Sequence, residues 1–144
     1  MHEAGHSLIA LIVGAKVVKV DLFLLPNVMC DILNVENTGL VAIGLGGIII
    51  PYLVSFILKP NLFWIWYANT IVRGISLLAL VISVVSIIMW LNGNIVQNED
   101  IVQVLTVFND GARLFLIIFA LMIIYGVIRI ITDKPLITIN EYFS

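Results

Sequence analysis

The sequence predicts an all-α membrane protein of about four transmembrane helices, with a short β-hairpin or re-entrant segment after the first helix. Of its 144 residues, 62% are hydrophobic and 11% are charged, and the mean hydropathy is +1.17. A soluble domain of this size cannot cover so much apolar surface with polar side chains. Apolar runs long enough to cross a bilayer also recur along the chain. We therefore expect residues 1–144 to form one integral membrane domain.

The first apolar segment is shorter than a membrane span. Only 13 residues precede Gly14, and at the usual helical rise they cover roughly 20 Å of a bilayer core that is about 30 Å thick. We expect these residues to be the last part of a helix that begins upstream of Met1, so that the domain lacks part of its N-terminal helix.

An extended segment is predicted between the first and second spans. Residues 15–38 include the β-branched residues Val17, Val18 and Val20, and the pair Pro26-Asn27 is typical of a turn. This pattern predicts a short β-hairpin or a re-entrant strand.

Three further apolar runs predict spans at 39–58, 70–91 and 112–131. The run 39–58 contains no charged residue and has about the length that crosses a bilayer. Aromatic residues of the kind that settle at the headgroup level precede the next run: Trp64, Trp66 and Tyr67. Arg73, near the start of that run, is expected to extend outward to the headgroups.

The residues between the last two spans differ in character from the rest. Asn92-Gly93-Asn94 predicts a turn, and residues 101–108 are rich in Val, Ile and Thr, which favours extended backbone. Within a membrane, extended backbone is tolerated only where protein or a water-filled cavity surrounds it. This stretch therefore indicates a functional site. Residues 133–144 are expected to form a short tail outside the bilayer.

The charged residues exclude one class of partner and suggest an orientation. The net charge is −2 and the isoelectric point is near 5.5, so the chain has no basic surface that would bind nucleic acid. If the spans alternate, Lys59, Arg129 and Lys134 fall on one side of the membrane, and Lys16 and Lys19 on the other. The excess of positive charge predicts a multi-pass protein of the cell membrane with a cytoplasmic C-terminus.

The motif His2-Glu3-Ala4-Gly5-His6 carries the chemistry. Two histidines four residues apart face the same way on a helix and can bind one metal ion, while Glu3 is placed to activate a metal-bound water. Zinc accepts imidazole nitrogens, and in catalytic sites it keeps one position open for water. The alternative reading is a polar helix end in which the side chains only interact with the helix dipole.

A third protein ligand must come from a carboxylate, because the chain has no other histidine and its single Cys30 stands alone. Asp110 precedes Gly111 at the start of the last span, and Asp100 lies in Asn98-Glu99-Asp100. Either aspartate could instead be an N-cap of a following helix, and Asp110 could also pair with Arg113.

Two segments resemble a known family. His2-Glu3-Ala4-Gly5-His6-Ser7-Leu8, followed by Gly14-Ala15-Lys16-Val17, resembles the first motif of the site-2 protease family of intramembrane zinc metalloproteases. Asp110-Gly111-Ala112-Arg113-Leu114 resembles that family's second motif, and Gly44-Leu45-Gly46-Gly47 is similar to its Gly-rich segment. The resemblance implies that Asp110 is the third metal ligand. Asp100 remains the alternative, because the Asn and Pro that usually precede the family's Asp are not at the expected spacing.

The resemblance implies an intramembrane zinc metalloendopeptidase that hydrolyses peptide bonds of membrane-embedded substrates, with Glu3 activating a zinc-bound water. Its partners would be the lipid bilayer and a membrane protein or peptide substrate. An alternative is a non-catalytic membrane scaffold or protective protein of the same fold. A small ion carrier is less favoured, because a glutamate between two metal-spaced histidines suits hydrolysis better than conduction. The sequence does not specify an oligomeric state.

Overall fold

The computed structural model of the chain describes residues 1–21, 27–58, 63–94 and 100–133. Of the described residues, 79% are helical, and the remaining regular structure is one two-stranded antiparallel sheet. The elements in chain order are α1 (His2–Ile12), β1 (Lys16–Asp21), β2 (Asn27–Asp31), α2 (Asn37–Ile57), α3 (Phe63–Leu91), α4 (Asp100–Val107), η1 (Asn109–Gly111) and α5 (Ala112–Asp133). The predicted combination of helices with a small hairpin is confirmed.

Three helices among the described residues are long and apolar enough to cross a membrane: Asn37–Ile57, Phe63–Leu91 and Asn109–Asp133. They cover the three runs predicted as complete spans. The count of four spans is not confirmed, because α1 has only 11 residues. The structure thus supports a membrane protein, while Lys59 and Lys134, on which the predicted orientation depends, lie outside the described residues, as does the tail after 133.

The hairpin follows directly from the end of α1. The helix ends at Ile12, and Gly14, just beyond its C-cap Val13, has a φ of 81° that glycine adopts at no steric cost. The Ala15 backbone N–H donates to the Ala10 carbonyl at 2.8 Å and turns the chain into β1. The predicted hairpin is therefore confirmed. Asn27 of the predicted turn is the first residue of β2 and pairs with Asp21, whereas Pro26 lies outside the described residues.

Residues 101–108 do not form the extended segment that their composition predicts. Asp100–Val107 is an α-helix of eight residues, and the prediction of extended backbone is wrong. Ile101, Val102 and Leu105 are buried and recur with helical spacing, so packing of one helix face overrides the β-propensity of Val, Ile and Thr. The turn predicted at Asn92-Gly93-Asn94 is confirmed, with Gly93 at a φ of 79°.

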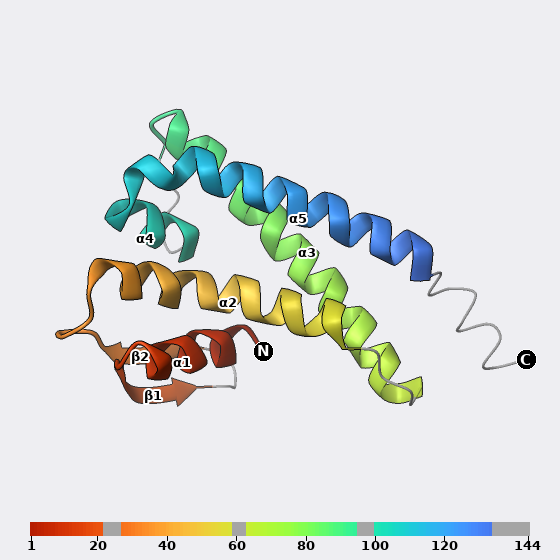
Figure 1. Ribbon diagram of the computed structural model, residues 1–144, viewed down its shortest axis with the longest axis horizontal. Helices are drawn as coiled ribbons and strands as arrows, with labels where there is room; N and C mark the ends of the chain where they lie inside the picture. The colour runs from red at the N-terminus through yellow and green to blue at the C-terminus, as the bar shows by residue number, and fades with distance from the viewer. Residues whose placement is uncertain (22–26, 59–62, 95–99, 134–144) are drawn as a thin grey trace, which may run out of the picture.

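α2 is the central element of the molecule (Figure 1). α1 packs against it and the hairpin packs against α1, while α4 lies along its N-terminal part. α3 also packs on α2, and α5 packs mainly on α3 and reaches α2 through side chains. The core lies between α2, α3, α4 and α5, and Tyr52 of α2 donates its hydroxyl hydrogen to the Met122 carbonyl of α5 at 2.6 Å. Many large apolar side chains of α3 and α5 point outward, which suits helices that face lipid.

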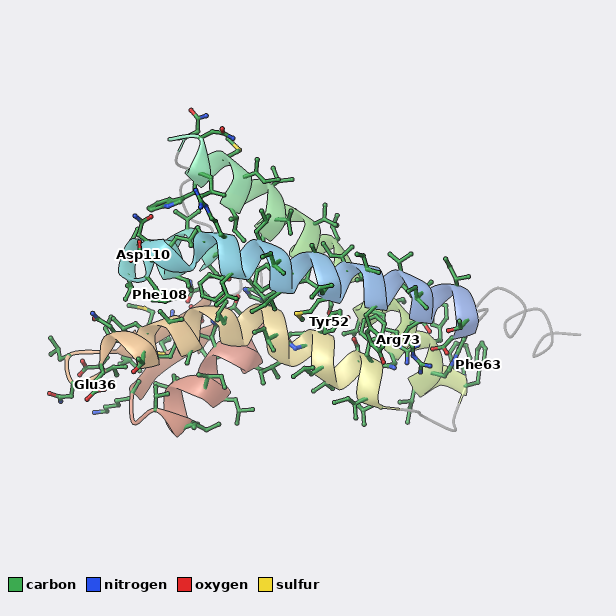
Figure 2. All side chains as sticks on the ribbon, turned by 45° about the horizontal axis from the view of Figure 1, so that its top comes forward. Glu36, Tyr52, Phe63, Arg73, Phe108 and Asp110 are labelled. Carbon is green, nitrogen blue, oxygen red and sulfur yellow. The ribbon has the colours of Figure 1, made fainter. Side chains whose placement is uncertain are left out.

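Arg73 does not extend outward as the sequence suggested. It is 6% exposed, its Nε donates to the Ser55 carbonyl at 2.7 Å, and its Nη1 donates to Asp133 Oδ2 at 2.6 Å. Its guanidinium also lies over the Phe56 ring at 5.1 Å. One arginine therefore links α2, α3 and α5 at the end of the bundle where α2 and α5 finish, as Figure 2 illustrates.

Candidate metal centre

His2 and His6 lie on one face of α1, as their spacing predicts. Their Nε2 atoms are 3.1 Å apart, and the two rings meet edge to face with centroids separated by 4.6 Å. Two imidazole nitrogens at this distance are in position to bind one cation together.

Asp100, the first residue of α4, completes the group. Its Oδ2 lies 2.8 Å from His2 Nε2 and 3.2 Å from His6 Nε2. Among the residues that the structure describes, these three form the one group of His, Cys, Asp and Glu side chains that could hold a metal ion, with all ligand atoms within 4.8 Å of one another. The donors come from segments 94 residues apart in the sequence.

The distances between these donors suit zinc. Bonds of 2.0–2.1 Å in a tetrahedral arrangement separate neighbouring ligand atoms by roughly 3.3 Å. The observed separations of 2.8, 3.1 and 3.2 Å are close to that value, so a small outward movement of the side chains would admit the ion. The set of two nitrogens and one oxygen is typical of catalytic zinc sites and leaves a fourth position for water.

Asp110, which the resemblance favoured as third ligand, is not part of this group. It lies in η1, beyond the far end of α4 from Asp100, and it is exposed to solvent. Because α4 is a helix, its eight residues separate its two ends by about 12 Å. The geometry therefore brings the alternative, Asp100, to the histidines. The helical spacing of the apolar residues after Asp100 is the sequence signal that could have pointed to it.

The surroundings of His6 fix the orientation of its ring. His6 is 8% exposed, and its Nδ1 donates to the Ile43 carbonyl of α2 at 2.7 Å. A ligand histidine commonly uses its second nitrogen in this way, which aims Nε2 at His2 and Asp100; loss of the Nε2 proton would leave its lone pair for the metal.

Asp100 is held in its ionised form. Burial alone would raise its pKa, but the hydrogen bonds from His2 and His6 outweigh that effect and hold the pKa well below its usual range. Its place in the first turn of α4 acts in the same direction, because the positive end of the helix dipole stabilises a carboxylate. A carboxylate must be ionised to bind a metal, so Asp100 is prepared for that role.

Glycines on α2 allow the two ligand-bearing helices to approach. A Cβ on Gly47 would collide with the His6 ring and lie 2.8 Å from His2 Cε1, and a Cβ on Gly46 would lie 2.9 Å from the Gly5 carbonyl oxygen of α1. A Cβ on Gly44 would collide with Val104 of α4. The segment that resembled a family Gly-rich segment is thus the surface against which both α1 and α4 pack.

A cavity of about 660 Å³ opens beside the three donors. Its wall includes His2, His6, Asp100 and Glu3, together with residues of β2, α2 and α4. Glu3 therefore faces the same space as the metal-binding groups. Sequence reasoning did not identify Gln103 of α4 or Asn27 of β2, which also line this cavity. No chemical motif marks them, and only the folded chain brings them to the site.

Comparison of the chain with protein-family models, with curated proteins and with solved structures finds no match. The resemblance to site-2 proteases consequently rests on the motif residues themselves, and the functional argument depends on the geometry of the site.

Proposed function

We propose that this protein is an intramembrane zinc metalloendopeptidase. The observation that carries the proposal is the convergence of His2, His6 and Asp100 on the wall of a cavity that Glu3 also lines. Ionisable side chains are costly beside membrane-spanning helices and are functional by default. Both histidines of the chain are used in this one group, which favours a metal site over a chance polar cluster.

His2, His6 and Asp100 would hold the ion. Zinc held in this way lowers the pKa of a water molecule to near 7 and polarises a carbonyl group. Glu3 then acts as general base, since it follows His2 directly in α1 and shares the cavity. It accepts a proton from water as the water oxygen bonds to the peptide carbonyl carbon. When the C–N bond breaks, Glu3 passes that proton to the leaving amine nitrogen.

The position of the site on α2 suggests the substrate. Ile43 and Gly47 contact the ligand histidines and follow Asn37, the start of a candidate span, by roughly 9–15 Å at the helical rise. The site therefore lies beside membrane-embedded backbone near one face of the bilayer. A peptide segment of a membrane protein would reach it with its backbone locally unwound. We further propose a location in the cell membrane with a cytoplasmic C-terminus, from the distribution of Lys and Arg.

The metal site is tested by the zinc content of the detergent-purified full chain and its variants. We expect one zinc ion per chain in the wild type, and a loss of zinc in His2→Ala and Asp100→Ala, because each variant removes one ligand. Asp110→Ala is the matched control and should retain zinc. Retention by Asp100→Ala with loss in Asp110→Ala would move the third ligand to Asp110.

Hydrolysis is tested with a model membrane substrate and the variant Glu3→Gln. The amide keeps the size of Glu3 but cannot accept the proton, so we expect cleavage to fall by about 10²-fold or more while zinc remains bound. Equal cleavage by the variant and the wild type would contradict a protease. The non-catalytic scaffold of the same fold would then be the better interpretation.

A further inference from the structure

One face of α4 forms a wall of the cavity. Asp100, Gln103, Val104 and Val107 line it, and their spacing of i, i+3, i+4 and i+7 places them on one side of a helix. Ile101 and Leu105 occupy the opposite side and are fully buried. The helix that supplies the third metal ligand therefore also presents a glutamine amide to the cavity, one turn further along.

The Gln103 amide is free to bind a ligand. Gln103 is exposed, and within the described ranges the hydrogen bond that involves it uses its backbone carbonyl, which accepts from Thr106 Oγ1 at 2.6 Å. Its side chain has no protein partner there. Residues at i and i+3 on a helix have their Cβ atoms about 5–6 Å apart, a distance that a glutamine side chain can cover.

The cavity has few donors for a developing negative charge. No Lys, Arg or Tyr occurs among the described residues that line it, and the side-chain amides on its wall are Gln103 and Asn27. Asn27 lies on the β2 side of the cavity, whereas Gln103 shares a helix face with Asp100. Gln103 is therefore the amide that shares a helix with one of the metal-binding residues.

A donor beside the metal would assist peptide hydrolysis. As the water oxygen bonds to the carbonyl carbon and Glu3 takes its proton, the carbonyl π-electrons move onto the carbonyl oxygen, which becomes negative. When the C–N bond breaks, those electrons return and the amine nitrogen receives the proton. A donor that is aimed at this oxygen lowers the barrier, because its hydrogen bond is strongest when the charge is greatest.

We propose that Gln103 is a catalytic residue that donates its side-chain N–H to the carbonyl oxygen of the bond being cleaved. This role rests on the hydrolytic function proposed above. It assigns to α4 two tasks at the site, metal binding through Asp100 and stabilisation of the transition state through Gln103.

The test compares Gln103→Leu and Gln103→Glu with the wild type in the full-length, zinc-loaded protein. Both variants remove the donor, so we expect kcat to fall by about 10²–10³-fold with KM and zinc content nearly unchanged. Asn92→Ala is the control, because it deletes an amide in the turn after α3 that bonds to the Ile88 carbonyl and does not line the cavity.

A second measurement does not depend on turnover. A phosphonate peptide carries charged oxygens where the transition state has them, and its dissociation constant should rise about 100-fold in Gln103→Leu, whereas that of the matching uncleaved peptide should change little. Unchanged kcat and unchanged phosphonate affinity in Gln103→Leu would overturn the role. Loss of zinc in this variant would also overturn it, by assigning Gln103 to the structure of the metal site.

Failure of the hydrolytic proposal has a different signature. If Glu3→Gln cleaves as fast as the wild type, the proposed protease function is contradicted, whatever the result for Gln103→Leu. If Glu3→Gln is inactive and Gln103→Leu cleaves like the wild type, only the proposed role of Gln103 is contradicted.

Discussion

At the scale of single residues, the site depends on the protonation of three side chains. His2 and His6 bind a metal only as neutral imidazoles, whose ordinary pKa is about 6.5. Asp100 differs from them, because the histidine hydrogen bonds hold its pKa well below the usual range. A carboxyl with a lowered pKa stays ionised until the solution is far more acidic, so Asp100 does not exchange a proton when zinc binds near neutral pH.

The release of zinc on acidification should therefore begin with protonation of His6 and not of Asp100. We predict that the zinc affinity falls on acidification and that the fall begins above pH 6.5, the ordinary pKa of histidine. Burial lowers the pKa of His6, but its hydrogen bonds with Asp100 and the Ile43 carbonyl raise that pKa by more, while Asp100 remains charged. The measurement is zinc retained against a competing chelator as a function of pH. In Asp100→Asn the affinity should be lower and its fall should begin at a lower pH, because the charge and hydrogen bond of Asp100 that raise the pKa of His6 are removed. A fall that begins at the same pH in the wild type and in Asp100→Asn would contradict the interaction between Asp100 and His6.

At the scale of the elements, the site is made by helices that pack closely on α2. α1 contributes His2 and His6 across Gly46 and Gly47, while α4 contributes Asp100 across Gly44. Two helices that carry ligands can meet at one point only because the helix between them has no side chains there. The small residues of α2 thus determine where the ligands stand as much as the ligands' own helices do.

We predict that Gly47→Ala lowers zinc affinity at least about tenfold and stability by about 1–3 kcal/mol, the usual range for overpacking. The added Cβ would collide with the His6 ring, and His6 is nearly buried and cannot move freely. Zinc content and thermal unfolding in detergent measure the two effects.

Gly74→Ala on α3 is the matched control. No heavy atom lies within 4 Å of a Cβ built there, so this substitution should keep zinc and should not destabilise the helix. If Gly47→Ala also kept full zinc affinity, close packing of α1 on α2 would not be what positions His6.

The sequence predicted which residue types form the site better than which distant residues meet there. The spacing of His2 and His6 determines that both imidazoles share a helix face, and the structure has them so. The third ligand could not be derived in the same way. The position of the third ligand depends on whether residues 101–108 are extended or helical. Local propensity favours extended backbone there, but burial of Ile101 and Leu105 on one face favours the helix. Asp110 was favoured by its motif and Asp100 is brought in by packing.

The same distinction applies to the fold. Long apolar runs predicted the positions of α2, α3 and α5 because membrane spans are defined by length and composition alone. The inward orientation of Arg73 was missed, since its partners Ser55 and Asp133 belong to other helices. Contacts between distant segments leave little trace in one sequence.

At the scale of the whole molecule, the two ends of the helix bundle are held by different chemistry. One end has the His2, His6 and Asp100 group, and the other has Arg73 between Ser55 and Asp133, with Arg129 Nη2 at 3.7 Å from the same carboxylate. The Arg73 side chain is 8% exposed and that of Asp133 is 26% exposed. Removing Asp133 would leave the buried Arg73 without its carboxylate, and removing Arg73 would leave Asp133 with only the longer contact to Arg129.

We predict that Arg73→Leu destabilises the protein by about 3–5 kcal/mol, the cost of breaking a buried ion pair from one side. Thermal unfolding in detergent is the measurement, and Asp133→Asn should give an effect of similar sign. Arg113→Leu, which changes an exposed arginine of α5, is the control and should alter stability by less than about 0.5 kcal/mol. Near-additive effects in the Arg73→Leu, Asp133→Asn double variant would contradict a direct interaction.

The separation of 94 positions between His6 and Asp100 also has a consequence for biosynthesis. Both imidazoles leave the ribosome before the carboxylate that joins them, which emerges only after the two long apolar helices α2 and α3 have been made. A nascent or truncated chain that ends before Asp100 therefore cannot form the three-donor site. The site would stay inert toward neighbouring proteins until α4 has been made.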